Sequence, residues 1–238
     1  MEQVVSALLW LWGGLLLGLF GSMVTLASLV LPMRRYDPAL KWMCRTLLRA
    51  LGIRVRAEGL DNIRPEQTYL FMSNHVNIFD VFVLGGYLPQ LVRGVELESH
   101  FRWFFYGMVI KRIGNIPISH HRPLSAMESL RKASQALARG ISIVLLPEGH
   151  RTLDGQLRPF ARAPFAMARH AGVDIVPVAM LNAFRINRKG SWLIHPGPVT
   201  LRIGKPMPYA LAHTLDSKML REKVRESIAQ LLTAPPAE

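Results

Sequence analysis

Residues 4–31 form an apolar run that contains no Asp, Glu, Lys or Arg side chain. A helix of about 20 apolar residues is long enough to cross the hydrocarbon core of a bilayer, so the run predicts a retained membrane-anchoring helix. A cleaved signal peptide fits less well, because no basic segment precedes the run and no small-x-small cleavage site follows it. The glycines within the run leave open whether it spans the bilayer or dips into one leaflet as two shorter helices. A buried hairpin of a soluble protein is the structural alternative.

Beyond residue 50 the pattern alternates between short β-branched runs and longer helical stretches. Strands that alternate with helices favour an α/β fold, with a largely parallel central sheet flanked by helices. We therefore divide the chain into a membrane-anchoring helical segment with a basic juxtamembrane region (1–50) and a second domain (51–238). The predicted strands are 53–59, 68–74, 91–96, 114–119, 141–149, 173–180 and 198–206, and the predicted helices are 78–88, 99–112, 124–138, 160–171 and 214–232.

The basic residues of the chain indicate which partner the first segment binds. The formal net charge is +13, from 29 Lys and Arg against 16 Asp and Glu, which attracts either nucleic acid or an anionic lipid surface. Basic residues directly after an apolar segment are typical of the cytoplasmic side of a membrane. No nucleic-acid-reading motif accompanies the charge, so we expect a lipid surface and no nucleic-acid partner. The basic residues that follow the run are Arg34, Arg35, Lys41, Arg45 and Arg49.

Three polar clusters stand where predicted strands end. SNHVNIFD (73–80) follows the second strand, SHHR (119–122) the fourth, and PEGHRT (147–152) the fifth. In parallel sheets, reactive groups gather at the carboxyl ends of the strands. We therefore expect the three clusters to lie at neighbouring strand ends and to form one site.

His75 and Asp80 stand five residues apart in the first cluster. On one continuous helix this separation would turn the two side chains about 140° apart, so they could not meet. If His75 instead ends the strand and Asp80 begins the next helix, the chain folds back and the carboxylate reaches an imidazole nitrogen. Such a contact fixes the histidine tautomer and leaves the other nitrogen free to accept a proton. The helix dipole alone would also favour Asp80 at a helix start, which is the structural alternative.

No protein nucleophile accompanies this pair. The chain has no G-x-S-x-G motif, and its single cysteine, Cys44, also excludes an intramolecular disulfide and a multi-cysteine zinc site. A His–Asp pair without a nucleophile suits a substrate that brings its own hydroxyl, which His75 would deprotonate. Arg122 and Arg151, in the other two clusters, suit an anionic oxygen of that substrate, although each alone is typical of a solvated surface.

The first cluster resembles a motif of the glycerolipid acyltransferases, the 1-acylglycerol-3-phosphate acyltransferase family. The family's first motif, N-H-x4-D, is NHVNIFD here, and the resemblance implies that His75 is the general base and Asp80 its partner. The fourth motif, an apolar-Pro-apolar run, is IVPVAM (175–180), with Pro177 in place. The resemblance runs from about residue 40 to residue 206.

The third motif of that family, [FL]-P-E-G-T-R-S, is LPEGHRT (146–152) in this chain. The resemblance implies that Glu148, Gly149 and Arg151 hold the phosphate of the acceptor. The region before the ELES segment usually carries a lysine in the family, and here Arg93 is the nearest cation.

The second motif departs from the family pattern. It usually reads G-x-I-F-I-D-R and here is GNIPISHHR (114–122), so that Ser119 and His120 replace the family's Asp and Arg. Residues two apart in an extended chain point to the same face, so Arg122 is predicted to bind the acceptor in place of the missing arginine. His150 replaces the family's Thr in the third motif. All these changes surround the expected acceptor pocket.

The resemblance implies a membrane-bound acyltransferase, with residues 51–238 as the acyltransferase domain on the cytoplasmic side of the inner (cytoplasmic) membrane. The donor would be a thioester of CoA or acyl carrier protein, and the acceptor a lysophospholipid. The expected acceptor is 1-acylglycerol-3-phosphate, which would give phosphatidic acid, and no metal or organic cofactor is implied. The alternative is a related O-acyltransferase with another lysolipid or alcohol as acceptor, for example a lyso-aminolipid.

Two further alternatives come from other functional classes. A lipid-binding or scaffolding membrane protein without catalytic activity would also have an apolar N-terminal segment. The intact His75–Asp80 pair argues against this alternative. A metal site made of His75, Asp80, His120 and His121 is a weaker alternative, because the spacing matches no usual zinc pattern.

Overall fold

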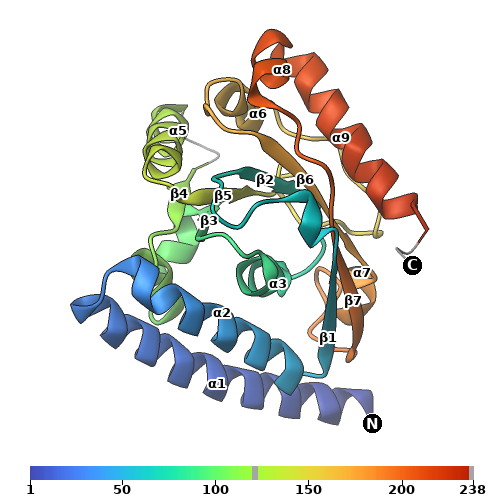
Figure 1. The fold of residues 1–238 in the computed structure, drawn as a ribbon. Helices are drawn as coiled ribbons and strands as arrows, with labels where there is room; N and C mark the ends of the chain where they lie inside the picture. Colours follow the sequence, from blue (N-terminus) through green and yellow to red (C-terminus); the bar gives the residue numbers. More distant parts are fainter. Residues whose placement is uncertain (120–122, 236–238) are drawn as a thin grey trace.

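The computed structural model describes residues 1–119 and 123–235. Its centre is a seven-stranded sheet in the order β1-β7-β6-β2-β5-β3-β4 (Figure 1). The strands are β1 (Ile53–Glu58), β2 (Leu70–Ser73), β3 (Val92–Leu97), β4 (Ile116–Ile118), β5 (Ser142–Leu145), β6 (Ile175–Leu181) and β7 (Gly197–Ile203). Each of them falls within or next to one of the seven runs predicted from the sequence, so the α/β prediction is confirmed.

The sheet is mainly parallel. Strand β2 pairs in parallel with β5 and β6, and β3 pairs in parallel with β5 and β4. Strand β7 runs antiparallel to its neighbour β6, and β1 follows the direction of β7. The carboxyl ends of β6, β2, β5, β3 and β4 therefore share one edge of the sheet.

Helices cover both faces of this sheet (Figure 1). They are α1 (Glu2–Val30), α2 (Met33–Ala50), α3 (Asp80–Tyr87), α4 (Tyr106–Arg112), α5 (Pro123–Ala138), α6 (Ala163–Ala168), α7 (Ala183–Ile186), α8 (Tyr209–Thr214) and α9 (Ser217–Thr233), with 3₁₀ turns η1 (Leu60–Asn62) and η2 (Glu98–Arg102).

One of the predicted helices is divided in the structure. The stretch 99–112 becomes η2 and α4, because Trp103 between them has an extended backbone, with φ −67° and ψ 134°, and α4 packs against η2. A Cβ atom at Gly107 would lie only 2.5 Å from the backbone oxygen of Phe101, so glycine permits this close approach. The helix predicted at 214–232 corresponds to α9, which begins where the Asp216 side chain accepts a hydrogen bond from Met219 N at 2.7 Å. Helix α8 is an additional short helix directly before it.

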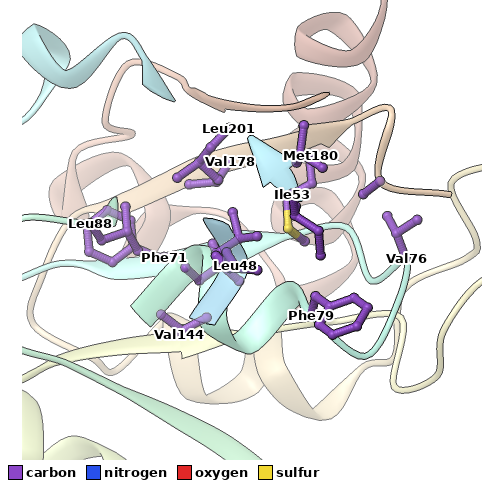
Figure 2. Packing of buried hydrophobic residues seen from close by; sticks show 14 of the residues in the cluster. Leu48, Ile53, Phe71, Val76, Phe79, Leu88, Val144, Val178, Met180 and Leu201 are labelled. Atoms are coloured by element: carbon purple, nitrogen blue, oxygen red, sulfur yellow. The ribbon is translucent and has the colours of Figure 1, made fainter. Parts of the chain in front are cut away.

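The core consists of two layers, one on each face of the sheet. Neighbouring residues of a strand point to opposite faces, so Phe71 faces α2 and α3 whereas Leu70 faces α5, α6 and α9. Figure 2 shows the first layer, in which Leu48 of α2 lies among Phe71, Val144 and Val178 of the sheet. Both layers contain aliphatic and aromatic side chains that are fully buried.

Helices α1 and α2 run side by side along one face of the molecule (Figure 1). Leu47 and Leu48 of α2 belong to the first core layer, and Leu9, Trp10 and Leu16 of α1 pack against it. The division at residue 50 stays a prediction from the sequence, but the first segment is packed on the second domain. Helix α1 is long and apolar enough to cross a membrane, with a mean hydropathy of 2.0 over its most apolar window, of which 17% is buried.

Candidate active site

Two of the three polar clusters meet at the carboxyl edge of the sheet. Because β2 and β5 are neighbours, the turns that follow them, 74–79 and 146–152, lie side by side. The prediction that the third cluster lies at a neighbouring strand end is wrong, because β3 separates β4 from β5 in the sheet. Within that third cluster His120, His121 and Arg122 lie outside the described residues.

The first turn brings His75 and Asp80 together. His75 follows the end of β2, Asp80 is the first residue of α3, and His75 Nδ1 lies 2.8 Å from Asp80 Oδ2. The fold-back predicted from the spacing is therefore confirmed. Since Nδ1 faces the carboxylate, Nε2 is the imidazole nitrogen left to exchange a proton. The His75 side chain is 21% exposed and that of Asp80 is 1% exposed, so the histidine is the member that a substrate can reach.

Asp80 is fixed by the backbone of the same turn. Its Oδ2 atom also accepts hydrogen bonds from Val76 N at 2.6 Å and from Asn77 N at 3.0 Å. The Oδ1 atom is buried and has no hydrogen-bond partner among the described residues. One carboxylate oxygen thus orients the imidazole and shapes the loop that carries it.

Two asparagines that sequence reasoning missed hold this turn to the neighbouring strand. The Asn74 side chain makes two hydrogen bonds with the backbone of Met180 in β6. Asn74 Nδ2 donates to Met180 O at 3.1 Å, and Asn74 Oδ1 accepts from Met180 N at 2.8 Å. Asn77 donates from Nδ2 to Ala183 O at 2.6 Å. Both side chains are buried, and buried amides need such partners. The signal in the sequence is that both asparagines stand in the polar cluster 73–80, directly after a predicted strand.

Glu148 connects the second turn to the first. Its Oε1 atom accepts a hydrogen bond from His75 N at 2.7 Å, and its Oε2 atom accepts one from Arg158 N at 2.9 Å. A further bond runs from Thr152 N to His75 O at 2.9 Å. Burial raises the pKa of the Glu148 carboxyl above its usual range, and the two backbone N–H groups oppose that shift. Both oxygens of Glu148 are thus committed to the backbone, and they position His75.

Gly149 and Arg151 lie in the same turn. Gly149 has a φ of +73°, a left-handed conformation that favours glycine, and it lets the chain reverse directly after Glu148. Arg151 is half-buried, and its guanidinium has no hydrogen bond or ion pair with any residue in the ranges 1–119 and 123–235. It precedes Thr152, whose backbone N–H is bonded to His75 O, so the turn that carries this cation adjoins the turn that carries the histidine.

Arg93 lies elsewhere. It is near the start of β3, away from the carboxyl edge, and is only 3% exposed. Its Nη1 atom bonds to Asp37 Oδ1 of α2 at 2.9 Å, and Lys41 Nζ lies 3.1 Å from the other oxygen of that carboxylate. This buried network joins α2 to the sheet, so Arg93 does not replace the family's lysine at the acceptor site.

The arrangement suits acid–base chemistry on a hydroxyl. A histidine oriented by a buried carboxylate can take a proton from an alcohol and return it to a leaving group. Arg151 provides positive charge in the adjoining turn, and a guanidinium suits an anionic group of the same substrate.

This chain is similar in sequence to known acyltransferases. A family model described as Acyltransferase matches residues 54–181, which include the whole site. The 1-acyl-sn-glycerol-3-phosphate acyltransferase of Pseudomonas aeruginosa is 31% identical over 194 residues, covering 79% of this chain and 74% of that protein. The alpha form of the human enzyme of that name is 27% identical over 178 residues, covering 74% of this chain and 63% of that protein.

A solved structure has the same fold. The crystal structure of PlsC, the 1-acyl-sn-glycerophosphate (LPA) acyltransferase from Thermotoga maritima, aligns with a TM-score of 0.80 and 18% sequence identity. The alignment covers 98% of both chains, so it includes the two N-terminal helices as well as the sheet.

Proposed function

The chain belongs to the acyltransferase family, and we propose that it transfers a fatty acyl group to the free hydroxyl of a lysophospholipid. The proposed acceptor is 1-acylglycerol-3-phosphate and the product phosphatidic acid, as the names of the curated relatives suggest. The proposed donor is a thioester of CoA or acyl carrier protein. The observation that carries the proposal is the 2.8 Å contact between His75 Nδ1 and Asp80 Oδ2, in a turn that is bonded to the turn of Arg151.

In the proposed reaction His75 Nε2 takes the proton of the acceptor hydroxyl as its oxygen attacks the thioester carbonyl. The new C–O bond forms, the C–S bond breaks, and the departing thiolate receives the proton from His75. Asp80 stabilises the imidazolium between these two steps. The acceptor supplies the nucleophile and the donor supplies the leaving group, so the step needs neither a metal ion nor an organic cofactor.

We propose that Arg151 binds the phosphate of the acceptor, and that Arg122, which lies outside the described residues, assists it. Glu148 and Gly149 belong to the same turn, and their contribution to acceptor binding is indirect, because they shape the turn and hold His75. A phosphate monoester beside His75 would place the acceptor's hydroxyl near Nε2, which is the orientation that the reaction needs.

Arg151→Ala tests this assignment. A charge-assisted hydrogen bond is worth about 1.5–3 kcal/mol, so acceptor kcat/KM should fall roughly 10- to 150-fold while the KM of the donor stays nearly unchanged. The measurement is acceptor-dependent release of free thiol from acyl-CoA, with lysolipids that differ in headgroup. Arg162→Ala is the matched control, because Arg162 is an exposed arginine of the same connection and should have little effect.

The same panel separates the proposed acceptor from its alternative. Faster turnover with 1-acylglycerol-3-phosphate than with a lyso-aminolipid supports the phosphate acceptor. If Arg151→Ala and Arg122→Ala are both without effect on the phosphate acceptor, and another lysolipid is the better substrate, the alternative O-acyltransferase takes its place.

We propose that α1 lies in one leaflet of the inner (cytoplasmic) membrane, with the catalytic domain on the cytoplasmic side. Helix α1 contacts protein along its length: Ser6 bonds to Ile194, Gly13 packs on Leu51, and Gly21 packs on Phe105. Its outer face is apolar and exposed from Val4 to Val30. A helix that lies against the domain over its whole length presents one side to lipid, as interfacial helices do.

Exposed aromatic side chains near α1 extend the proposed lipid-binding surface. In α2, Trp42 is 53% exposed and lies among basic residues, a composition typical of the interface between lipid headgroups and water. Phe104 is 99% exposed and Trp103 55% exposed in the connection to α4, which packs on α1. Lipid would cover these side chains.

A double substitution, Leu11→Asp with Leu15→Asp, should release the protein from vesicles. The two side chains are 64% and 59% exposed on the outer face of α1. Each leucine buried in lipid is worth about 1.5–3 kcal/mol, so the partition coefficient should fall at least tenfold in co-sedimentation with anionic vesicles. Met219→Asp is the control, since Met219 is 56% exposed on α9. Equal partitioning of the double variant and the wild type would contradict the assignment.

A further inference from the structure

Helix α1 touches the turn that carries the His75–Asp80 pair. The ring of Trp10 stacks on the ring of Phe79, with centroids 6.1 Å apart and an interplanar angle of 25°. Phe79 is the residue directly before Asp80 and is only 5% exposed. A residue of the apolar N-terminal helix therefore covers the catalytic turn from outside.

Trp10 is itself held in place. Its indole Nε1 donates a hydrogen bond to the backbone oxygen of Trp192, in the connection that leads to β7. One turn earlier on α1, Ser6 is fully buried, and its Oγ atom accepts a hydrogen bond from Ile194 N at 3.0 Å. These contacts fix both the position of α1 along the domain and the rotation that points Trp10 at Phe79.

Movement of Phe79 would reach Asp80 through the turn. Phe79 N donates to Asn77 Oδ1 at 2.8 Å, and Asn77 N donates in turn to Asp80 Oδ2 at 3.0 Å. That same oxygen orients the imidazole of His75. A ring at Phe79 that lost its stacking partner would be free to swing outward, and the two hydrogen bonds would carry the displacement to the carboxylate.

We propose that Trp10 is a positioning residue for the His75–Asp80 pair, so that α1 completes the active site as well as binding lipid. The proposal rests on the proposed acyl transfer. Trp10 does not touch the substrate; it acts through Phe79. The physical consequence is that the seating of α1 on the domain sets the geometry of the catalytic pair.

The test compares the steady-state kinetics of α1 variants in the full chain, with acyl-CoA and 1-acylglycerol-3-phosphate in mixed micelles. Trp10→Ala should lower kcat about 3- to 10-fold, the range that the loss of one aromatic pair supports, while the KM of both substrates stays within twofold. Trp10→Phe keeps a stacking ring and should recover most of the rate. Thermal unfolding of each variant shows whether it is folded.

Two matched controls separate positioning from anchoring. Trp12 lies about 200° from Trp10 around the helix and is 50% exposed, so Trp12→Ala should weaken vesicle binding and leave kcat in micelles unchanged. Phe20 contacts Trp42 of α2, with ring centroids 5.8 Å apart, and Phe20→Ala removes an aromatic ring of α1 far from the turn. It should also leave kcat unchanged.

A double-mutant cycle with Phe79→Leu gives the decisive readout. If Trp10 acts through Phe79, Trp10→Ala should cost little further kcat once Phe79 has been changed. Multiplicative losses, or a Trp10→Ala variant that is folded with unchanged kcat, would overturn the inference while leaving acyl transfer intact. If the wild type gives no acceptor-dependent thiol release with any lysolipid, the proposed function fails first.

Discussion

His75→Ala is expected to lower kcat by roughly 10²- to 10⁴-fold, the usual contribution of a positioned general base. The imidazole is the group that takes the acceptor's proton in the proposed reaction, and alanine leaves no substitute. Asp80 remains in place and keeps its bonds to Val76 N and Asn77 N, so the turn should retain its shape. Release of free thiol from acyl-CoA, measured with and without the acceptor, gives the rate.

A second histidine that faces a carboxylate provides the control. His100 Nδ1 lies 3.5 Å from Glu96 Oε2, beyond the end of β3. If the shorter His75–Asp80 contact marks the base, His100→Ala should stay within a few-fold of the wild type. The reverse ranking of the two variants would transfer the catalytic role to the Glu96–His100 pair.

The sheet and the His75–Asp80 contact could be predicted from the sequence because both follow from local rules. Runs of β-branched residues mark strands, and a strand that ends before a helix start brings residues five apart within reach of each other. The order of strands in the sheet follows from no local rule. The sequence therefore predicts the cluster after β4 beside the other two, whereas in the structure β3 lies between β4 and β5.

The role of Glu148 is a second feature that could not be predicted from the sequence. In the sequence it is a charged residue of a strand-exit turn, which suggests contact with substrate. In the structure both of its oxygens accept backbone N–H groups, one of them from His75. Only the pairing of β2 with β5 brings these atoms together, and that pairing joins residues 73 positions apart.

The side of α1 that packs on the domain is a third feature that could not be predicted from the sequence. An apolar run predicts affinity for lipid, but every residue type in it suits lipid and protein equally well. Trp10 and Trp12 look alike in the sequence, yet one packs on Phe79 and the other is 50% exposed. The difference depends on which side of the helix meets the domain, and that is set by distant contacts such as Ser6 with Ile194.

Asp80→Asn is expected to lower kcat by roughly 10²- to 10⁴-fold, comparable to the loss of an equivalent aspartate in hydrolase triads. If the amide oxygen takes the place of Oδ2, it can still accept from His75 Nδ1, Val76 N and Asn77 N. The amide nitrogen would then occupy the place of Oδ1, which is buried without a partner among the described residues. The turn is preserved, but the negative charge that stabilises the imidazolium is lost.

Asp37→Asn separates this catalytic effect from loss of stability. Asp37 is also a buried carboxylate, 6% exposed, and it bonds to Arg93 at 2.9 Å. Removing one partner of a buried ion pair leaves the other charge uncompensated, so Asp37→Asn should lower the midpoint of thermal unfolding and change kcat only a few-fold. Asp80→Asn should show the opposite pattern, a large loss of kcat with a modest change in that midpoint. An Asp80→Asn variant within threefold of the wild-type kcat would reduce Asp80 to a residue that shapes the turn and favours the start of α3.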